Sequence, residues 1–250
     1  MQEKLINRVP HIILLYWIIK IASTTLGESG ADMFSMTFDL GYGSTIIIFI
    51  TLFLLFLGIK LYIKKYDTLY YWLLFTTTAI VGTAISDYMD RTLELGYTIG
   101  SIVLIVSLLL VLGVWYLKEK SISVENITTQ RAEIFYWMAF LVANTLGTAV
   151  GDFLADELNI GFLYSALIIS TLLMITALLH FYTKVSSLLL FWIAFVLTRP
   201  FGATFGDLLT KSSEDGGLGV GTIGTSLFFT VVLIIAMIKE IKVEKLKKDN

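Results

Sequence analysis

The sequence predicts an all-α polytopic membrane protein. We expect eight transmembrane helices, built as four parallel two-helix repeats with a pseudo-fourfold arrangement about the membrane normal. Hydrophobic residues make up 56% of the 250-residue chain and charged residues only 15%, which would leave a soluble domain short of polar groups for its surface. Apolar runs of roughly 20 residues, long enough to cross a bilayer, recur along the whole chain. An internal repeat provides the remaining evidence for this class.

One pattern occurs four times without insertion: an aromatic residue, Trp, nine residues, Gly, four residues, Asp, eight residues and Gly. Four anchors at fixed spacing in four copies mark a tandem repeat. Its tryptophans are Trp17, Trp72, Trp137 and Trp192; its first glycines are Gly27, Gly82, Gly147 and Gly202; its aspartates are Asp32, Asp87, Asp152 and Asp207. The repeats form a first half at 1–117 and a second half at 134–250, joined by a polar linker at 118–133 that is predicted to be cytoplasmic.

Each repeat contains a motif-bearing helix followed by a plain apolar one, and the last motif glycine reads as the turn between them. The first span starts near Pro10, whose missing N–H costs no hydrogen bond in a first helical turn. The eight spans are expected at about 10–37, 44–61, 69–93, 98–117, 135–156, 162–181, 188–209 and 219–238. Because every repeat has two spans, the four motif-bearing helices cross the membrane in the same direction. Their aspartates therefore lie at similar depth, and the plain helices form a lipid-facing outer layer.

The distribution of basic residues predicts the orientation. One side of the membrane carries fourteen of the 18 basic residues: Lys4, Arg8, Lys60, Lys64, Lys65, Lys118, Lys120, Arg131, Lys184, Lys239, Lys242, Lys245, Lys247 and Lys248. The opposite side has only Arg91 and Lys211 and is otherwise acidic. Cytoplasmic loops are enriched in Lys and Arg, so both termini are predicted to be cytoplasmic. The basic C-terminal tail is expected to contact anionic lipid of the bilayer and not nucleic acid.

Each anchor of the motif has a physical role. Tryptophan prefers the membrane interface, so the four tryptophans are interpreted as anchors at the cytoplasmic side. The aspartate follows 15 residues later, roughly 22 Å along a helix, in the outer half of the membrane. A small residue precedes every aspartate, and with the motif glycine it forms a ridge on which helices can approach closely. These small residues are Ala31, Ser86, Gly151 and Gly206.

Helical periodicity places further polar residues near the face that carries the aspartates. The residue four positions before Asp is Glu28, Thr83, Thr148 or Ala203, and the residue eight before it is Thr24, Ala79, Asn144 or Arg199. A carboxylate in the bilayer is costly unless it meets water, a partner or an ion, so we expect the four aspartates to converge. The alternative is that they cap the outer helix ends. Arg199 is interpreted as a counter-charge, paired with either Asp207 or Glu28.

The repeated segments TTLGESGAD, GTAISD, NTLGTAVGD and RPFGATFGD resemble the bacterial uncharacterised membrane-anchored protein family. That family is built of four tandem copies of a short repeat of unknown function. The resemblance covers nearly the whole chain, and LTRPFGATFGD and ITTQRAEIFYW are its most specific parts. It implies a protein of the bacterial cytoplasmic (inner) membrane and provides no activity to transfer.

The residues themselves favour a transporter or channel for a hard divalent cation. Oxygen-only ligands, without Cys or His in the motif, suit Mn²⁺, our first choice, or Mg²⁺ or Ca²⁺. The cation is the expected substrate, and no covalently bound cofactor is implied. The expected metal ligands are Asp32, Asp87, Asp152, Asp207 and Glu28, with Thr83, Thr148, Asn144 and Arg199 as further site residues.

Two other function classes remain open. An intramembrane enzyme would hold Mg²⁺ with the pairs Asp87 and Asp90 or Asp152 and Asp156, or would use paired aspartates as an aspartyl protease does. These pairs are not shared by the four copies, so the sequence does not favour an enzyme. A non-catalytic assembly or sensor protein is the third class. The oligomeric state stays open.

Overall fold

The fold comes from a computed structural model that describes residues 7–124 and 127–249. Lys4, and the side chains of Lys247 and Lys248, which contribute to the predicted charge asymmetry, lie outside what is described. The described residues contain helices and no strands. The eight α-helices are α1 Leu14–Asp32, α2 Gly41–Ile63, α3 Thr68–Asp87, α4 Tyr97–Glu119, α5 Gln130–Asp152, α6 Phe162–Tyr182, α7 Ser187–Thr210 and α8 Thr222–Asp249. Short π-helical segments continue α1, α3 and α5: Met33–Thr37, Tyr88–Thr92 and Phe153–Glu157.

The helices match the expected spans except at some ends. Helix α1 begins at Leu14, so Pro10 precedes it and is not in its first turn. The linker at 118–133 is shorter than predicted, because α4 runs to Glu119 and α5 begins at Gln130, where Thr129 caps it by accepting a hydrogen bond from the Ala132 N–H at 3.0 Å. Helix α8 begins later than expected, because a glycine-rich loop precedes it. It is also longer than expected, because it continues to Asp249.

Seven of these helices, α2 to α8, are long and apolar enough to cross a membrane. Within the described chain, α1 is the helix whose composition does not qualify, because it carries Lys20, Glu28 and several Ser and Thr residues. Every residue from Ala22 to Asp32 in α1 is buried. A helix buried on all sides by other helices does not need an apolar surface toward lipid.

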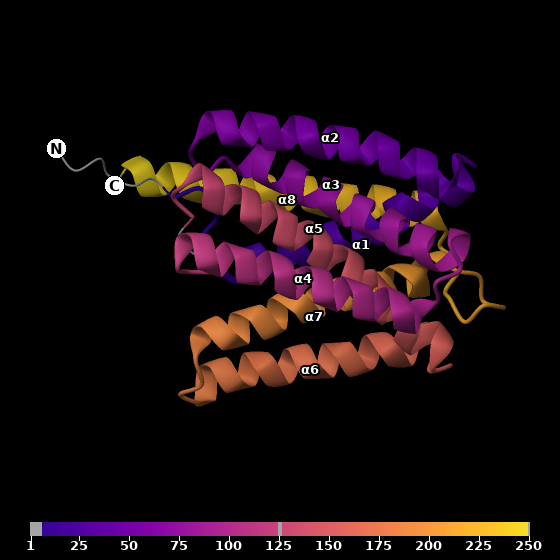
Figure 1. The fold of residues 1–250 in the computed structure, drawn as a ribbon. Coiled ribbons are helices and arrows are strands. Elements are labelled where there is room, and N and C mark those ends of the chain that lie inside the picture. The colour runs from indigo at the N-terminus through magenta and orange to yellow at the C-terminus, as the bar shows by residue number, and fades with distance from the viewer. Residues whose placement is uncertain (1–6, 125–126, 250) are drawn as a thin grey trace.

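The odd-numbered helices form an inner layer (Figure 1). Helix α1 packs on α3, α3 on α5, α5 on α7, and α7 on α1. Each even-numbered helix packs outside the odd helix of the following repeat, with α2 on α3, α4 on α5, α6 on α7 and α8 on α1. The outer helices expose apolar side chains such as Leu54, Leu109 and Ile175. This separation into a polar inner layer and an apolar outer layer follows the two helix types seen in the sequence.

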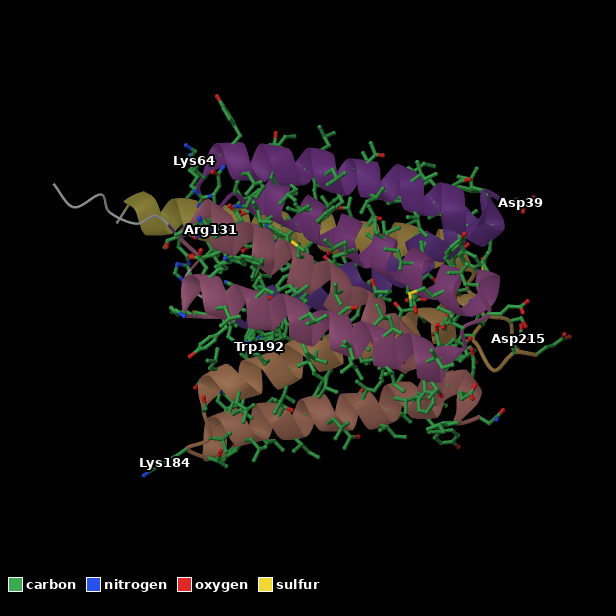
Figure 2. All side chains as sticks on the ribbon, viewed as in Figure 1. Asp39, Lys64, Arg131, Lys184, Trp192 and Asp215 are labelled. Carbon is green, nitrogen blue, oxygen red and sulfur yellow. The ribbon has the colours of Figure 1, made fainter. Side chains whose placement is uncertain are left out.

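The two ends of the bundle differ in charge (Figure 2). Lys64, Arg131 and Lys184, which lie in or near the loops that precede α3, α5 and α7, all lie at one end. Asp39 and Asp215, which follow α1 and α7, lie at the other. The odd helices therefore run in the same direction, from the basic end to the acidic end.

The motif glycines allow the odd helices to touch. A Cβ atom on Gly82 would lie 2.9 Å from both Asn144 Cβ and Thr145 N of α5. A Cβ atom on any of the other three would lie even closer to the next odd helix: Gly27 to Ala79, Gly147 to Arg199 and Gly202 to Thr24. Each neighbour holds the same repeat position, eight residues before Asp. The same contact between neighbouring odd helices therefore occurs four times, once for each copy of the motif.

Replacing Gly82 with alanine is expected to destabilise the protein by about 1–3 kcal/mol, the usual cost of forcing atoms into a packed contact. The added methyl group would meet the backbone of α5, which cannot move without separating the helices. Thermal unfolding in detergent measures the effect. Gly58→Ala in α2 is the matched control, because a Cβ there meets nothing within 4 Å. Equal melting temperatures for the two variants would contradict this role of Gly82.

Candidate functional site

The four motif aspartates lie at equivalent positions near the acidic end of the inner helices. Asp32, Asp87 and Asp152 are the last residues of α1, α3 and α5, and Asp207 lies three residues before the end of α7. All four side chains are buried, with 2–3% of each residue exposed. Burial of this degree argues against simple capping of helix ends at a solvent-facing surface.

Three carboxylates from two helices meet in one place. Glu28 and Asp32 of α1 and Asp87 of α3 each offer an oxygen, and these oxygens lie within 4.8 Å of one another. All three residues are buried. We call Glu28, Asp32 and Asp87 the carboxylate cluster. Like charges at this separation repel strongly in a medium of low dielectric constant, so a cation or a proton is needed to hold them together.

Asp152 and Asp207, which were also expected to converge, are not in this cluster, so it joins only two of the four motif aspartates. Asp152 interacts electrostatically with Glu28, Asp87 and Asp207, which repel it, and with Arg91, which attracts it, but its carboxylate has no hydrogen bond or direct ion pair with any described residue. Only 3% of Asp152 is exposed, so water does not solvate it freely. Asp207 Oδ1, in contrast, lies 3.2 Å from Lys211 Nζ. Asp152 is thus a buried carboxylate without a direct partner.

Arg199 of α7 reaches across the inner layer to three other helices. Both terminal nitrogens of Arg199 donate to Glu28 Oε2 at 3.2 Å. Nη2 also donates to Thr148 Oγ1 at 2.6 Å and to Thr83 Oγ1. These three acceptors share the repeat position four residues before Asp, and Ala203 holds it in the fourth copy. Of the two partners left open by the sequence, Arg199 therefore pairs with Glu28.

Asn144 lies elsewhere in the inner layer. Its side-chain amide donates to Thr78 Oγ1 at 2.9 Å, and its Cβ packs on Gly82. Asn144 thus joins α5 to α3 and has no described contact with the carboxylate cluster. The position eight residues before Asp is the one that touches the motif glycine of the preceding repeat, so its described contacts are between helices.

Two basic residues at the acidic end also pair with the aspartates. Lys211 Nζ lies 2.7 Å from Asp32 Oδ2, in addition to its contact with Asp207. Arg91 Nε lies 3.4 Å from Asp87 Oδ1. Burial disfavours the charged form of Lys211, but Asp207 and Asp32 outweigh it and raise the pKa of Lys211 above its ordinary value. Sequence reasoning missed both partners, although each stands four residues after a motif aspartate, one helical turn away.

An aromatic layer fills the inner helices nearer the basic end. Tyr16, Tyr71, Tyr136 and Phe191, which precede the motif tryptophans, are all buried. Tyr71 and Tyr136 share a hydrogen bond of 2.6 Å between their hydroxyl groups. Between this layer and Arg199, the buried Lys20 donates to Phe195 O at 2.6 Å and to Thr198 Oγ1. Packed aromatic and aliphatic groups therefore separate the carboxylate cluster from the basic end.

The interpretation of the tryptophans as interfacial anchors needs correction. Trp72 and Trp137 are fully buried within the protein, whereas Trp17 and Trp192 are partly buried. Trp72 donates its indole N–H to Glu240 Oε2 of α8 at 2.7 Å. Aromatic rings of one repeat contact the tryptophan of the next, as in Tyr71 with Trp137 at 5.1 Å between ring centroids. Contact between neighbouring repeats encloses these side chains, which a single amphipathic helix could not do.

Asp90 and Asp156, the second members of the carboxyl pairs considered for an enzyme, have contacts outside the carboxylate cluster. Asp90 packs against Gly100 of α4, and Asp156 accepts a hydrogen bond from the Tyr97 hydroxyl at 3.3 Å. Neither belongs to the carboxylate cluster, which is the group of three or more potential metal ligands found among the described residues.

The chemistry of the cluster suits a hard cation. Its ligand atoms are carboxylate oxygens, and the hydroxyl oxygens of Thr83 and Thr148, which accept hydrogen bonds from Arg199, lie nearby. Oxygen ligands of this kind are those that Mg²⁺, Ca²⁺ and Mn²⁺ prefer. Glu28, Asp32 and Asp87 are placed so that all three could bind the same ion. The site is nearer to the acidic surface, because the side chains of Lys211 and Arg91 are 20% and 37% exposed there.

Comparison with known proteins supports the repeat architecture. A family model described as Repeat of Unknown Function (DUF347) matches the chain four times, at residues 15–66, 70–121, 135–186 and 190–245. These matches follow the four copies of the motif, including the longer spacing between the second and third. No curated protein and no solved structure matches the chain. The chain therefore belongs to the DUF347 family of repeat proteins, with four tandem copies of the repeat.

Proposed function

We propose that this protein is a membrane transporter or channel for a hard divalent cation, with Mn²⁺ as first choice and Mg²⁺ or Ca²⁺ as alternatives. The observation that carries the proposal is the buried carboxylate cluster of Glu28, Asp32 and Asp87, whose oxygens lie within 4.8 Å of one another. Ionisable groups at membrane depth are costly and mark ion pathways more often than structural contacts.

Asp152 provides independent support. Its buried carboxylate has no hydrogen bond or ion pair with a described residue, yet it acts electrostatically on Glu28 and Asp87. Leaving such a group without a partner costs free energy that a bound cation would recover. If the motif carboxylates served only as structural ion pairs, Asp152 would be expected to have a direct basic partner, and it has none among the described residues.

The proposed architecture places the four repeats about a pseudo-fourfold axis along the membrane normal, with all eight helices crossing the bilayer. It is supported by the succession of contacts from α1 through α3, α5 and α7 back to α1. The repeated contact of each motif glycine with the same position of the next odd helix gives further support. In this arrangement α1 crosses inside the bundle, where its polar residues avoid lipid.

The proposed location is the bacterial cytoplasmic membrane, with both termini on the cytoplasmic side. The basic end, which carries Lys64, Arg131 and Lys184, supports this orientation (Figure 2). The carboxylate cluster then lies nearer the outer face, and the aromatic layer with Tyr71 and Tyr136 separates it from the cytoplasm. Arg199 serves as the internal counter-charge of Glu28 when the cation is absent.

The proposal predicts that Asp87→Asn and Asp152→Asn weaken binding of Mn²⁺ by roughly tenfold or more, since loss of even an outer-shell partner commonly costs 10–100-fold in metal affinity. Binding is measured by thermal shift of the purified protein with Mn²⁺, Mg²⁺, Ca²⁺ and Zn²⁺. Flux into proteoliposomes that contain a cation-sensitive dye measures transport. Both substitutions keep the side-chain volume and remove only the charge.

Asp39→Asn is the matched control, because Asp39 is an exposed aspartate at the same end of the bundle. It should leave binding and flux unchanged. If no cation stabilises the wild-type protein, or if both variants bind and conduct like the wild type, the transport proposal is wrong. Absence of any cation effect would favour the assembly or sensor class.

A further inference from the structure

Lys211 occupies the outer end of the carboxylate cluster. It directly follows α7, which ends at Thr210, and its ammonium group lies 2.7 Å from Asp32 Oδ2 and 3.2 Å from Asp207 Oδ1. These contacts join the first repeat to the fourth. The ammonium group is therefore where a cation coordinated by Asp32 would sit or approach.

The backbone of Lys211 is held in place by hydrogen bonds of its own. Its N–H donates to Asp207 O at 2.9 Å, and its carbonyl accepts from the Gly219 N–H at 2.9 Å. The loop folds back on α7 through further bonds, from Leu218 N to Leu208 O at 2.7 Å and from Val220 N to Leu209 O at 2.9 Å. Gly217 lies so close to the Lys211 carbonyl that a Cβ would collide with it. The four-carbon stem of the lysine extends from this fixed base.

This loop distinguishes the fourth repeat from the others. In the first three repeats a π-helical turn follows the motif aspartate, and the even helix begins at or directly after the last motif glycine. In the fourth repeat α8 begins only at Thr222, six residues after Gly216. The residue four positions after the aspartate is Met36, Arg91, Asp156 or Lys211. Of these, Lys211 pairs with aspartates of two repeats, whereas Arg91 pairs with Asp87 on its own helix.

We propose that Lys211 is a tethered competitor of the transported cation, occupying Asp32 and Asp207 when the site is empty and moving toward the outer face when a divalent cation binds. The inference rests on the proposed cation site. A divalent ion and an ammonium group repel each other and require the same oxygens, so both cannot occupy Asp32. The side chain is 20% exposed, which gives the ammonium group a path to water. Lys211 therefore sets the affinity of the site.

The first test measures affinity. Isothermal titration of the purified full-length chain with Mn²⁺ is expected to give Lys211→Gln a dissociation constant roughly tenfold lower than that of the wild type, within the usual range of coupling between two sites. Lys211→Arg keeps the competing charge and should bind weakly, like the wild type. Lys64→Gln, at the opposite end of the bundle, should change nothing.

The second test uses the wild-type protein, so it does not depend on the folding of a variant. An amine-reactive reagent is applied with and without Mn²⁺, and labelling of each lysine is quantified by mass spectrometry. Labelling of Lys211 is expected to increase several-fold with Mn²⁺, whereas that of the exposed Lys184 stays constant.

The outcomes separate the two proposals. If neither the wild type nor Lys211→Gln binds a divalent cation, the cation site itself is wrong. If the wild type binds Mn²⁺, but Lys211→Gln binds equally or more weakly and Mn²⁺ does not expose Lys211, the competitor role is wrong and the cation site stands.

Discussion

Replacing Arg199 with methionine is expected to destabilise the protein by about 3–5 kcal/mol, the usual cost of removing one partner of a buried ion pair. Only 2% of Arg199 is exposed, and its guanidinium group donates to Glu28, Thr83 and Thr148, which hold the same repeat position on α1, α3 and α5. Without it, the Glu28 carboxylate stays buried beside Asp32 and Asp87 and has lost its counter-charge. Equilibrium unfolding of the purified protein in micelles measures the change.

Two further variants separate charge from packing. Arg199→Met combined with Glu28→Gln should regain most of the lost stability, because no uncompensated charge remains at that position. Arg91→Met is the matched arginine control, since the side chain of Arg91 is 37% exposed and its pair with Asp87 should contribute less than about 1 kcal/mol. Equal losses for Arg199→Met and Arg91→Met would show that Arg199 does not hold the inner helices together.

Glu133→Ala is expected to cost a similar amount, about 3–5 kcal/mol, at the opposite end of the bundle. Glu133 of α5 lies 2.6 Å from Arg8 Nη1 and 2.9 Å from Lys60 Nζ, and the side chains of all three are at least 92% buried. The Lys60 ammonium group also donates to the Arg8 carbonyl at 2.9 Å. Removing the carboxylate leaves two buried cations next to each other. Unfolding under the same conditions as for Arg199 provides the measurement.

Glu119→Ala is the matched control for this prediction. Glu119 lies 3.9 Å from Arg131, whose side chain is 69% exposed, so the loss should stay below about 1 kcal/mol. The Glu133 network ties the segment before α1 and helix α2 of the first repeat to α5, the odd helix of the third repeat. If Glu133→Ala were no less stable than Glu119→Ala, these contacts would be incidental to assembly of the repeats.

The helices and their two classes could be predicted because both depend on local sequence. Apolar runs and turns locate each span, and Gly41, Gly96 and Gly161 have positive φ angles at the turns where the motif places them. The fourth repeat differed because Gly219 and Gly221 extend its turn and delay α8. A motif shared by four copies predicts their common structure, and an extra loop in one copy changes only that copy.

The tryptophans show where local reasoning failed. Each one looked like an interfacial anchor because, on an isolated helix, an aromatic residue near a basic loop has lipid on one side. In the folded protein Trp72 and Trp137 are enclosed by neighbouring repeats and by Glu240 of α8. Burial depends on which helix covers a side chain, and that information is not contained in the helix itself.

The sequence by itself determined that four helices carry an aspartate at the same repeat position, with a glycine that permits close packing and, in three of the four, a polar residue one turn earlier. Only the tertiary structure decided which charges meet: Arg199 with Glu28, Lys211 with Asp32 and Asp207, and Asp152 with no direct partner. The physical reason is that the pairs of Arg199 with Glu28 and of Lys211 with Asp32 form where α7 returns to α1, between residues 171 and 179 positions apart. Helical periodicity fixes the face on which a side chain lies, whereas the neighbour of that face is fixed by how the helices pack together.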